Sequence, residues 1–279
     1  MGSQHASEIE SGSRFAFGAN WARFLEVLDD ARVRMAEQSL KDMLGVADLS
    51  GKTLLDIGSG SGLFSLAARR LGARVHSFDY DPQSVACAEE LRRRYFPNDP
   101  DWKIEQGSIL DAGYVKTLGK HDVVYSWGVL HHTGKMWQAF ENASGLVAAD
   151  GRLFIAIYND QGRMSKVWLE VKRAYNRMPP SFRWVVLWPA MLRLWGPTTV
   201  RDLVSGRPFS TWRNYSEGSL RGMSPWRDVV DWVGGLPFEV ATPEEVFDFF
   251  RSRGFELVRL KTCAGGHGCN EFVFRVRRS

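Results

Sequence analysis

Cysteines, long apolar runs and strings of like charge are all scarce in this sequence. Its three cysteines, Cys87, Cys263 and Cys269, are too few and too scattered to build a disulfide framework, which suits a reducing compartment. No apolar stretch of the kind found in signal peptides occurs in the polar start, MGSQHASEIESGS. The most apolar stretch, Trp184 to Trp195, is interrupted by a proline and an arginine and is too short to cross a bilayer. We therefore expect a cytoplasmic protein that contacts membranes peripherally at most.

The charges are nearly balanced, with 36 lysines and arginines against 32 acidic residues and a net charge of +4. No run of basic residues exceeds three, so scattered surface cations explain the excess better than a nucleic-acid groove does. Nucleic acid is therefore not the expected partner. The 279 residues have an ordinary globular composition and suffice for one large domain with an insertion.

Short apolar segments alternate with helical patterns through the middle of the chain. After a flexible start, residues 15–44 have helical spacing of apolar side chains. Five strands are then predicted, with helical patterns between them: residues 53–57, 74–78, 102–106, 122–126 and 152–158. Such alternation is typical of a parallel sheet covered by helices on both faces. Near the end, a helix capped by Thr242 precedes two strands, 255–263 and 271–276, which we expect to pair as an antiparallel hairpin.

This pattern divides the chain into three parts. Residues 1–50 form an N-terminal helical lid, and residues 51–160 together with 241–279 form the sheet-containing core. Residues 161–240 interrupt the alternation and are rich in Trp, Arg, Pro and Gly, with helical pieces. We expect this segment to be a helical insertion in the core.

A glycine-rich loop follows the first predicted strand in the segment LLDIGSGSGLF. Gly58, Gly60 and Gly62 let the backbone turn sharply and approach a ligand closely. Dinucleotide enzymes use a similar turn, but their fingerprint requires Gly or Ala at the sixth position, where this chain has Leu63. The loop therefore indicates a nucleotide-like ligand other than a nicotinamide dinucleotide.

An acidic residue stands at the end of the second predicted strand, in VHSFDYD. Asp79 lies 21 positions after Gly58, and a carboxylate at this spacing can accept hydrogen bonds from both ribose hydroxyls. Tyr80 can pack against an adenine. The alternative is that Asp79 caps the helix that begins at Pro82, a role that Asp81 can fill equally well.

Five segments resemble the successive motifs of class I S-adenosylmethionine-dependent methyltransferases in order and spacing: LLDIGSGSG, VHSFDYDP, EQGSILD, HDVVYSWGVLHHTG and GRLFIAIY. The resemblance covers residues 52–158 and the closing hairpin from residue 255. It implies a Rossmann-like α/β fold. The sheet would have seven strands in the order 3-2-1-4-5-7-6, with an antiparallel last strand, helices on both faces and a helical insertion after strand 5. The resemblance also implies that this insertion, residues 161–240, forms a lid over the substrate.

The same resemblance implies S-adenosylmethionine as the cofactor. It implies that Asp56 lies beside the cationic amino-acid part of S-adenosylmethionine. Ser108 and Ile109 would lie beside its adenine, and Ser126 and Trp127 beside its methionine moiety. The residues expected to bind the cofactor are Asp56, Gly58, Ser59, Gly60, Asp79, Tyr80, Ser108, Ile109, Ser126 and Trp127.

Two adjacent histidines follow the fourth predicted strand. Methyl transfer from a sulfonium is an in-line displacement, so the enzyme must chiefly align the reactants. An oxygen nucleophile also needs a base, and histidine titrates near the working pH. His131 and His132 are the catalytic candidates, and His132 is preferred because it matches the histidine of many small-molecule methyltransferases. The alternative is that one or both brace the following loop.

The acceptor site is predicted from positions near the carboxyl edge of the sheet and from the lids. Tyr158 and Asn159 end the fifth strand, where ligands bind in open α/β folds. Trp21 lies in the N-terminal segment FAFGANW, a second lid candidate. The apolar helical segment of the insertion, residues 182–195, either covers a small core within the insertion or forms a surface patch that binds a hydrophobic acceptor or a membrane.

Motif order and the histidine make the chain similar to ubiquinone-biosynthesis O-methyltransferases, although its long aromatic insertion departs from them. The expected reaction is methylation of a small-molecule acceptor, at a hydroxyl oxygen of a partly hydrophobic compound. Sulfur or carboxyl methylation, tRNA methylation and cofactor binding without catalysis remain alternatives. No metal is expected, because Cys263, His267 and Cys269 lack a fourth ligand and are better explained as an ordinary turn.

Overall fold

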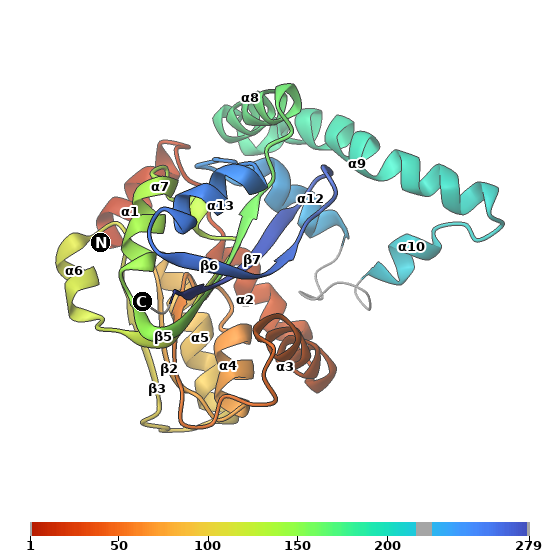
Figure 1. Ribbon diagram of the computed structural model, residues 1–279. Coiled ribbons are helices and arrows are strands. Elements are labelled where there is room, and N and C mark those ends of the chain that lie inside the picture. Colours follow the sequence, from red (N-terminus) through yellow and green to blue (C-terminus); the bar gives the residue numbers. More distant parts are fainter. Residues whose placement is uncertain (1, 216–224, 278–279) are drawn as a thin grey trace.

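The computed structural model describes residues 2–215 and 225–277. At its centre is a seven-stranded sheet with the order β3-β2-β1-β4-β5-β7-β6, in which β7 runs antiparallel to both of its neighbours (Figure 1). The strands are β1 (Thr53–Ile57), β2 (Arg74–Asp79), β3 (Trp102–Gln106), β4 (His121–Trp127), β5 (Val147–Tyr158), β6 (Phe255–Lys261) and β7 (Cys269–Val276). The predicted fold class, strand order and antiparallel last strand are confirmed.

Helices cover both faces of the sheet because the central strands are apolar on both sides. On β1, Leu54 belongs to one buried cluster and Leu55 and Ile57 to the other, as alternation along a strand requires. The first cluster includes residues of α3 (Asp30–Leu44), α4 (Leu63–Arg70) and α5 (Pro82–Tyr95). The second includes residues of α7 (Met136–Ser144) and α13 (Pro243–Arg251), and half-buried side chains of α6 (Ala112–Thr117) pack against it.

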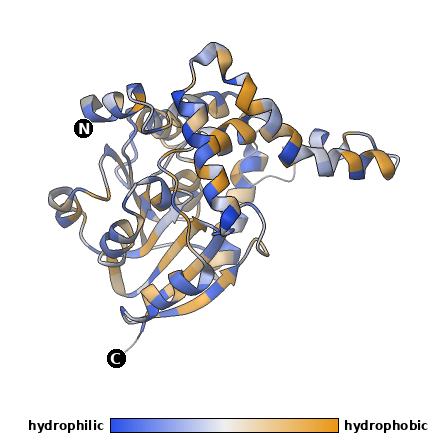
Figure 2. Ribbon diagram, turned by 90° about the horizontal axis from the view of Figure 1, so that it is seen from above, coloured by the Kyte–Doolittle hydropathy of each residue, from blue (hydrophilic) through white to orange (hydrophobic). Residues whose placement is uncertain are grey.

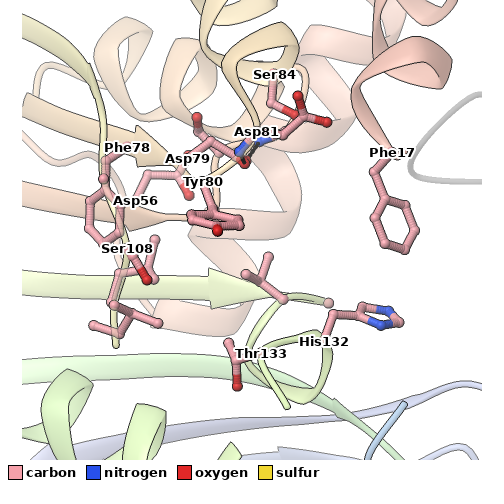
Figure 3. A pocket seen from close by; sticks show the side chains of 18 of the residues that line it. Phe17, Asp56, Phe78, Asp79, Tyr80, Asp81, Ser84, Ser108, His132 and Thr133 are labelled. Atoms are coloured by element: carbon pink, nitrogen blue, oxygen red, sulfur yellow. Dashed lines mark hydrogen bonds between the residues drawn. The ribbon is translucent and has the colours of Figure 1, made fainter. Parts of the chain in front are cut away.

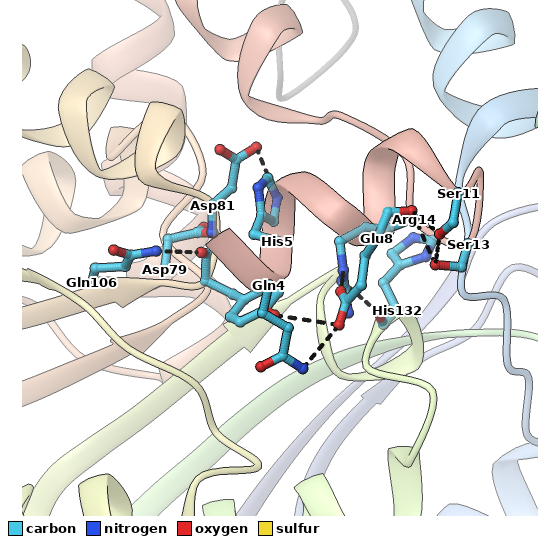
Figure 4. Close-up of polar contacts among 11 residues, drawn as sticks. Gln4, His5, Glu8, Ser11, Ser13, Arg14, Asp79, Asp81, Gln106 and His132 are labelled. Atoms are coloured by element: carbon cyan, nitrogen blue, oxygen red, sulfur yellow. Dashed lines mark hydrogen bonds and ion pairs between the residues drawn. The ribbon is translucent and has the colours of Figure 1, made fainter. Parts of the chain in front are cut away.

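The N-terminal region differs from the prediction in two ways. The single helical stretch over residues 15–44 is divided into α2 (Gly18–Val27) and α3, because Asp29 caps α3 by accepting a hydrogen bond from the Arg32 amide at 2.9 Å. The predicted flexible start is also wrong. Residues 2–10 form helix α1 (Gly2–Glu10), whose polar side chains bind residues that follow β2 (Figure 4). Local pattern could not reveal these distant partners.

The insertion contains α8 (Arg163–Arg177), α9 (Trp184–Val204), α10 (Ser210–Arg213) and α12 (Pro225–Gly234). One side of α9 packs on α8 and α12 around a separate small core that includes Trp168, Leu187, Met191 and Val233. The rest of α9 projects from the body of the protein with α10 at its far end (Figure 1). Within the described ranges, no helix combines the length and the apolar character needed to span a membrane.

Candidate functional site

A cavity of about 550 Å³ opens at the carboxyl ends of the parallel strands. It runs from the glycine loop and the end of β2 to the turn after β4. Figure 3 shows Asp56, Asp79 and Ser108 at one end of this space, with His132 and Phe17 at the other and Tyr80 between them. A nucleotide-like ligand and a second molecule can therefore share one cavity.

The glycine loop adopts a conformation that only glycine tolerates well. Gly58 has φ 75°, and a Cβ added there would lie 2.3 Å from Cγ1 of Val129. Gly62 has φ 81°, and its Cβ would lie 2.8 Å from Cα of Ala88. The loop is held against β2 by the Gly58 amide, which donates to the Phe78 carbonyl at 2.8 Å. These two glycines and the bond to Phe78 therefore define the shape of the loop.

Asp79 is tied to this loop and does not cap α5. Its Oδ2 accepts from the Gly60 amide and its Oδ1 from the Asp81 amide, both at 2.9 Å. The N-cap of α5 is Asp81, which accepts from the Gln83 amide at 2.9 Å. The alternative role of Asp79 as a helix cap is therefore wrong. Burial raises the pKa of Asp79 to about 6.

Asp56 lies deeper in the same end of the cavity and is 2% exposed. Ser65 donates its hydroxyl hydrogen to Oδ2 of Asp56. Burial, with a smaller contribution from the negative charge of Asp79, raises the pKa of Asp56 to about 7. One buried carboxylate and one half-buried carboxylate, both with raised pKa values, suit a positively charged ligand with hydroxyl groups.

Most of the other predicted cofactor residues line the cavity as well. These are Ser59, Tyr80, Ser108, Ile109 and Trp127. Ser126 does not line it: this side chain is fully buried and donates to the Ile57 carbonyl at 3.0 Å, which links β4 to β1.

Arg14 of the N-terminal segment lines the cavity and contacts several other segments (Figure 4). The Arg14 guanidinium bonds Glu8 at 2.6 Å and donates to the His132 carbonyl at 3.2 Å. Its centre also lies 4.9 Å from the ring centroid of Tyr80. Arg14 thus connects α1, the end of β2 and the turn after β4. Sequence reasoning missed this residue, because an isolated arginine in a polar segment carries no recognisable pattern.

The two histidines occupy different environments although both belong to one short 3-10 turn (Leu130–His132). His132 lines the cavity, and its Nδ1 donates to the Pro237 carbonyl at 2.6 Å. In the neutral ring, the lone pair is then on Nε2. His131 is fully buried away from the cavity lining; its Nδ1 accepts from the Tyr158 amide at 3.3 Å, and its ring centroid lies 3.9 Å from that of Tyr158.

The predicted Trp21 and Tyr158 both line the cavity. Trp21 packs against Gly60 of the glycine loop, whereas Tyr158 lies at the histidine end beside His131. Asn159 is absent from the lining; its Oδ1 accepts from Asn270 at 2.9 Å and so joins β5 to the closing hairpin.

The insertion contributes a carboxylate that the sequence did not suggest. Asp231 of α12 lines the cavity and accepts a hydrogen bond from Asn20 of α2. Lys172 of α8 is fully buried nearby, and its ammonium donates to the Trp232 carbonyl and lies 4.6 Å from the ring centroid of Phe238. Burial lowers the pKa of Lys172 to about 7. Charged residues on amphipathic helices normally face solvent, so neither residue stands out in the sequence.

Comparison with known proteins agrees with the geometry. Residues 55–153 match the family described as a methyltransferase domain. The ubiquinone biosynthesis O-methyltransferase of Xanthomonas oryzae pv. oryzae is 26% identical over 189 residues, which are 65% of this chain and 70% of that protein.

Two solved structures share the fold. The magnesium protoporphyrin IX methyltransferase of Synechocystis PCC 6803 with bound SAH has a TM-score of 0.51 at 13% identity, covering 88% of this chain and 84% of that one. A SAM-dependent methyltransferase of Aquifex aeolicus has a TM-score of 0.50 at 12% identity, covering 92% and 98%. The strand order, the succession of motifs and the matched domain agree, and together they support a class I S-adenosylmethionine-dependent methyltransferase with S-adenosylmethionine as its cofactor.

Proposed function

We propose that this methyltransferase methylates a hydroxyl oxygen on a small, partly hydrophobic molecule. The observation that carries the proposal is that His132, with Nδ1 bonded to the Pro237 carbonyl, lines the same cavity as Asp56 and Asp79. A base for the acceptor and carboxylates for the cofactor thus share one space that two small molecules can fill.

The cofactor end is assigned from its chemistry. Asp56 would neutralise the amino group of S-adenosylmethionine, and its burial at this end of the cavity supports the assignment. Asp79 would accept hydrogen bonds from the ribose hydroxyls. Its carboxylate has lone pairs for them in addition to those that bind the Gly60 and Asp81 amides. Tyr80, Ser108 and Ile109 would contact the adenine.

When bound, S-adenosylmethionine supplies an electrophilic methyl group on a sulfonium. Nε2 of His132 would remove the acceptor proton as the oxygen–methyl bond forms and the sulfur–methyl bond breaks. The Pro237 carbonyl holds the imidazole in the tautomer that this step requires. His131 would act as a positioning residue, since it is packed against Tyr158 behind the cavity wall.

The acceptor end is mainly aromatic with polar groups at its edge. Phe15, Phe17 and Tyr158 supply flat apolar surface, Trp21 would extend it from the glycine loop, and Asp231 supplies a hydrogen-bond acceptor. Such a lining favours an acceptor with a hydrophobic body and at least one hydroxyl group.

The contributing segments support three functional parts. Residues 1–50 would form a lid, since α1, Arg14 and Trp21 border the cavity. Residues 51–160 and 241–279 would form the catalytic core. Residues 161–240 would set acceptor specificity, because α12 places Asp231 in the lining.

A tritium-transfer screen tests the proposal directly. Labelled S-adenosylmethionine is incubated with quinone precursors, hydroxylated fatty acids, sugars, thiols, carboxylic acids and tRNA. We expect label in a hydroxylated hydrophobic compound, with a strong reduction in the His132→Ala variant. Label in thiols, carboxylic acids or tRNA alone would overturn the hydroxyl assignment. No label in any pool despite tight cofactor binding would overturn the catalytic assignment.

A further inference from the structure

Large apolar side chains are exposed mainly on one projecting part of the insertion, residues 182–213, here called the aromatic arm. Of the 15 large hydrophobic side chains that are exposed among the described residues, nine lie in the arm. They are Phe182, Trp184, Val185, Trp188, Leu192, Val200, Leu203, Val204 and Phe209.

The exposed apolar side chains of α9 face away from the insertion core. Leu187 and Met191 are buried against α8 and α12. Trp184, Trp188 and Leu192 follow at four-residue spacing and are 57%, 55% and 68% exposed. Figure 2 shows the projecting helix carrying apolar residues along much of its length. The arm therefore presents more apolar surface than its own core requires.

The aromatic arm also accounts for the net positive charge of the protein. It contains five arginines and one acidic residue, a net charge of +4 that equals the formal net charge of the whole chain. The acidic residue, Asp202, is buried and accepts from the Thr211 amide at 2.7 Å. Arg193, Arg207 and Arg213 are exposed beside the apolar side chains. The rest of the chain is neutral on balance.

We propose that the aromatic arm docks on the surface of an anionic lipid bilayer. Tryptophans and leucines would enter the boundary between headgroups and acyl chains, while the arginines pair with lipid phosphates. Charge complementarity favours this partner over a second copy of the chain, because an arm-to-arm contact would bring two surfaces of charge +4 together. An RNA backbone would satisfy the arginines but leave the exposed apolar side chains uncovered.

The position of the arm gives the docking a functional consequence. Helix α12 packs against α9 and also contributes Asp231 to the cavity lining. A bilayer at α9 would therefore lie next to the element that borders the acceptor end. The docking surface is separate from the catalytic residues, so the inference holds whichever acceptor is methylated.

Vesicle flotation of the full-length protein tests the proposal. The probes are vesicles of phosphatidylcholine alone and vesicles containing about one third phosphatidylglycerol, at low and high salt. We expect flotation with the anionic vesicles and a loss of flotation when salt is raised, because salt screens the attraction. The triple variant Trp184→Ser, Trp188→Ser, Leu192→Ser should lose at least tenfold in vesicle affinity, and Arg193→Glu with Arg207→Glu should do the same.

Matched controls keep the experiment interpretable. The variant Trp137→Ser, Val258→Ser, Leu260→Ser removes exposed apolar side chains outside the arm, and Arg74→Glu with Lys116→Glu reverses exposed charges outside it. Both controls should float like the unmodified protein, and all variants should keep its S-adenosylmethionine affinity. Failure of the unmodified protein to float, or equal flotation of arm variants and controls, would overturn the proposal. So would a lipid-independent dimer that the arm variants abolish.

Discussion

The Oδ2 atom of Asp79 accepts a hydrogen bond from the backbone amide of Gly60 at 2.9 Å, although the two residues lie 19 positions apart. This bond joins the end of β2 to the glycine loop that follows β1. Asp79, which we predict to bind the ribose of the cofactor, therefore also helps to shape the glycine loop. Removing its carboxylate should affect both functions.

Replacing Asp79 by Ala should weaken S-adenosylmethionine binding by about a hundredfold, because hydrogen bonds to a charged group are worth roughly 1.5–3 kcal/mol each. Isothermal titration calorimetry measures the change. Asp101→Ala, which removes an exposed carboxylate beside β3, should leave the affinity unchanged. Equal affinity in the two variants would refute the ribose assignment.

Cofactor affinity should depend on pH through Asp56. In the free protein, burial raises its pKa to about 7. A bound cation favours the ionised form, so binding releases a proton and affinity rises with pH up to about 7. We expect S-adenosylmethionine to bind roughly tenfold or more weakly at pH 5.5 than at pH 7.5.

The control for this dependence is Asp56→Asn, which should bind weakly at every pH and show a flatter profile. Asp79, whose pKa is raised to about 6 by burial, would supply the remaining slope at the acid end. An unmodified protein whose affinity is constant from pH 5.5 to 7.5 would contradict the proposed ion pair.

His132→Ala should lower kcat at least about a hundredfold while leaving cofactor affinity unchanged, because the proposed base is lost from the acceptor end. Steady-state kinetics on the acceptor found in the screen gives kcat. A loss of kcat below tenfold would indicate that His132 stabilises the loop after β4 and is not the base.

His131→Phe changes a fully buried residue that does not line the cavity, so it should reduce thermal stability more than turnover.

Lys172 should make the protein more stable as pH rises. Burial lowers its pKa from an ordinary 10.5 to about 7, so between these values the unfolded chain binds the proton and the folded chain does not. Stability should therefore increase from pH 7 towards pH 10, by up to about 1.4 kcal/mol per pH unit. Urea unfolding followed by tryptophan fluorescence measures this slope.

The comparison variant is Lys172→Met, which keeps a long side chain of similar length without the titrating group. The difference in unfolding free energy between the unmodified protein and this variant isolates Lys172 from other alkaline titrations. A difference that stays constant from pH 7 to pH 9 would show that the ammonium is not held in a low-polarity environment.

Much of the core could be predicted from sequence because its signals are local. Gly58 and Gly62 occupy backbone conformations that exclude other residues, and the strand that precedes them is apolar on both faces. The cofactor end therefore follows from a turn and two strand ends, which sequence pattern reports directly. The helical start was mispredicted because α1 owes its placement to Tyr80 and Asp81, about 70 residues away.

The sequence by itself determined the sheet order, the cofactor and the kind of reaction. Only the tertiary structure decided which of two adjacent histidines reaches the cavity, because Pro237 and Tyr158 orient the rings of His132 and His131 differently. It also decided that Asp231 lines the acceptor end. These outcomes depend on packing between segments that lie 27 to 211 residues apart, and spacing along the chain carries no record of such contacts.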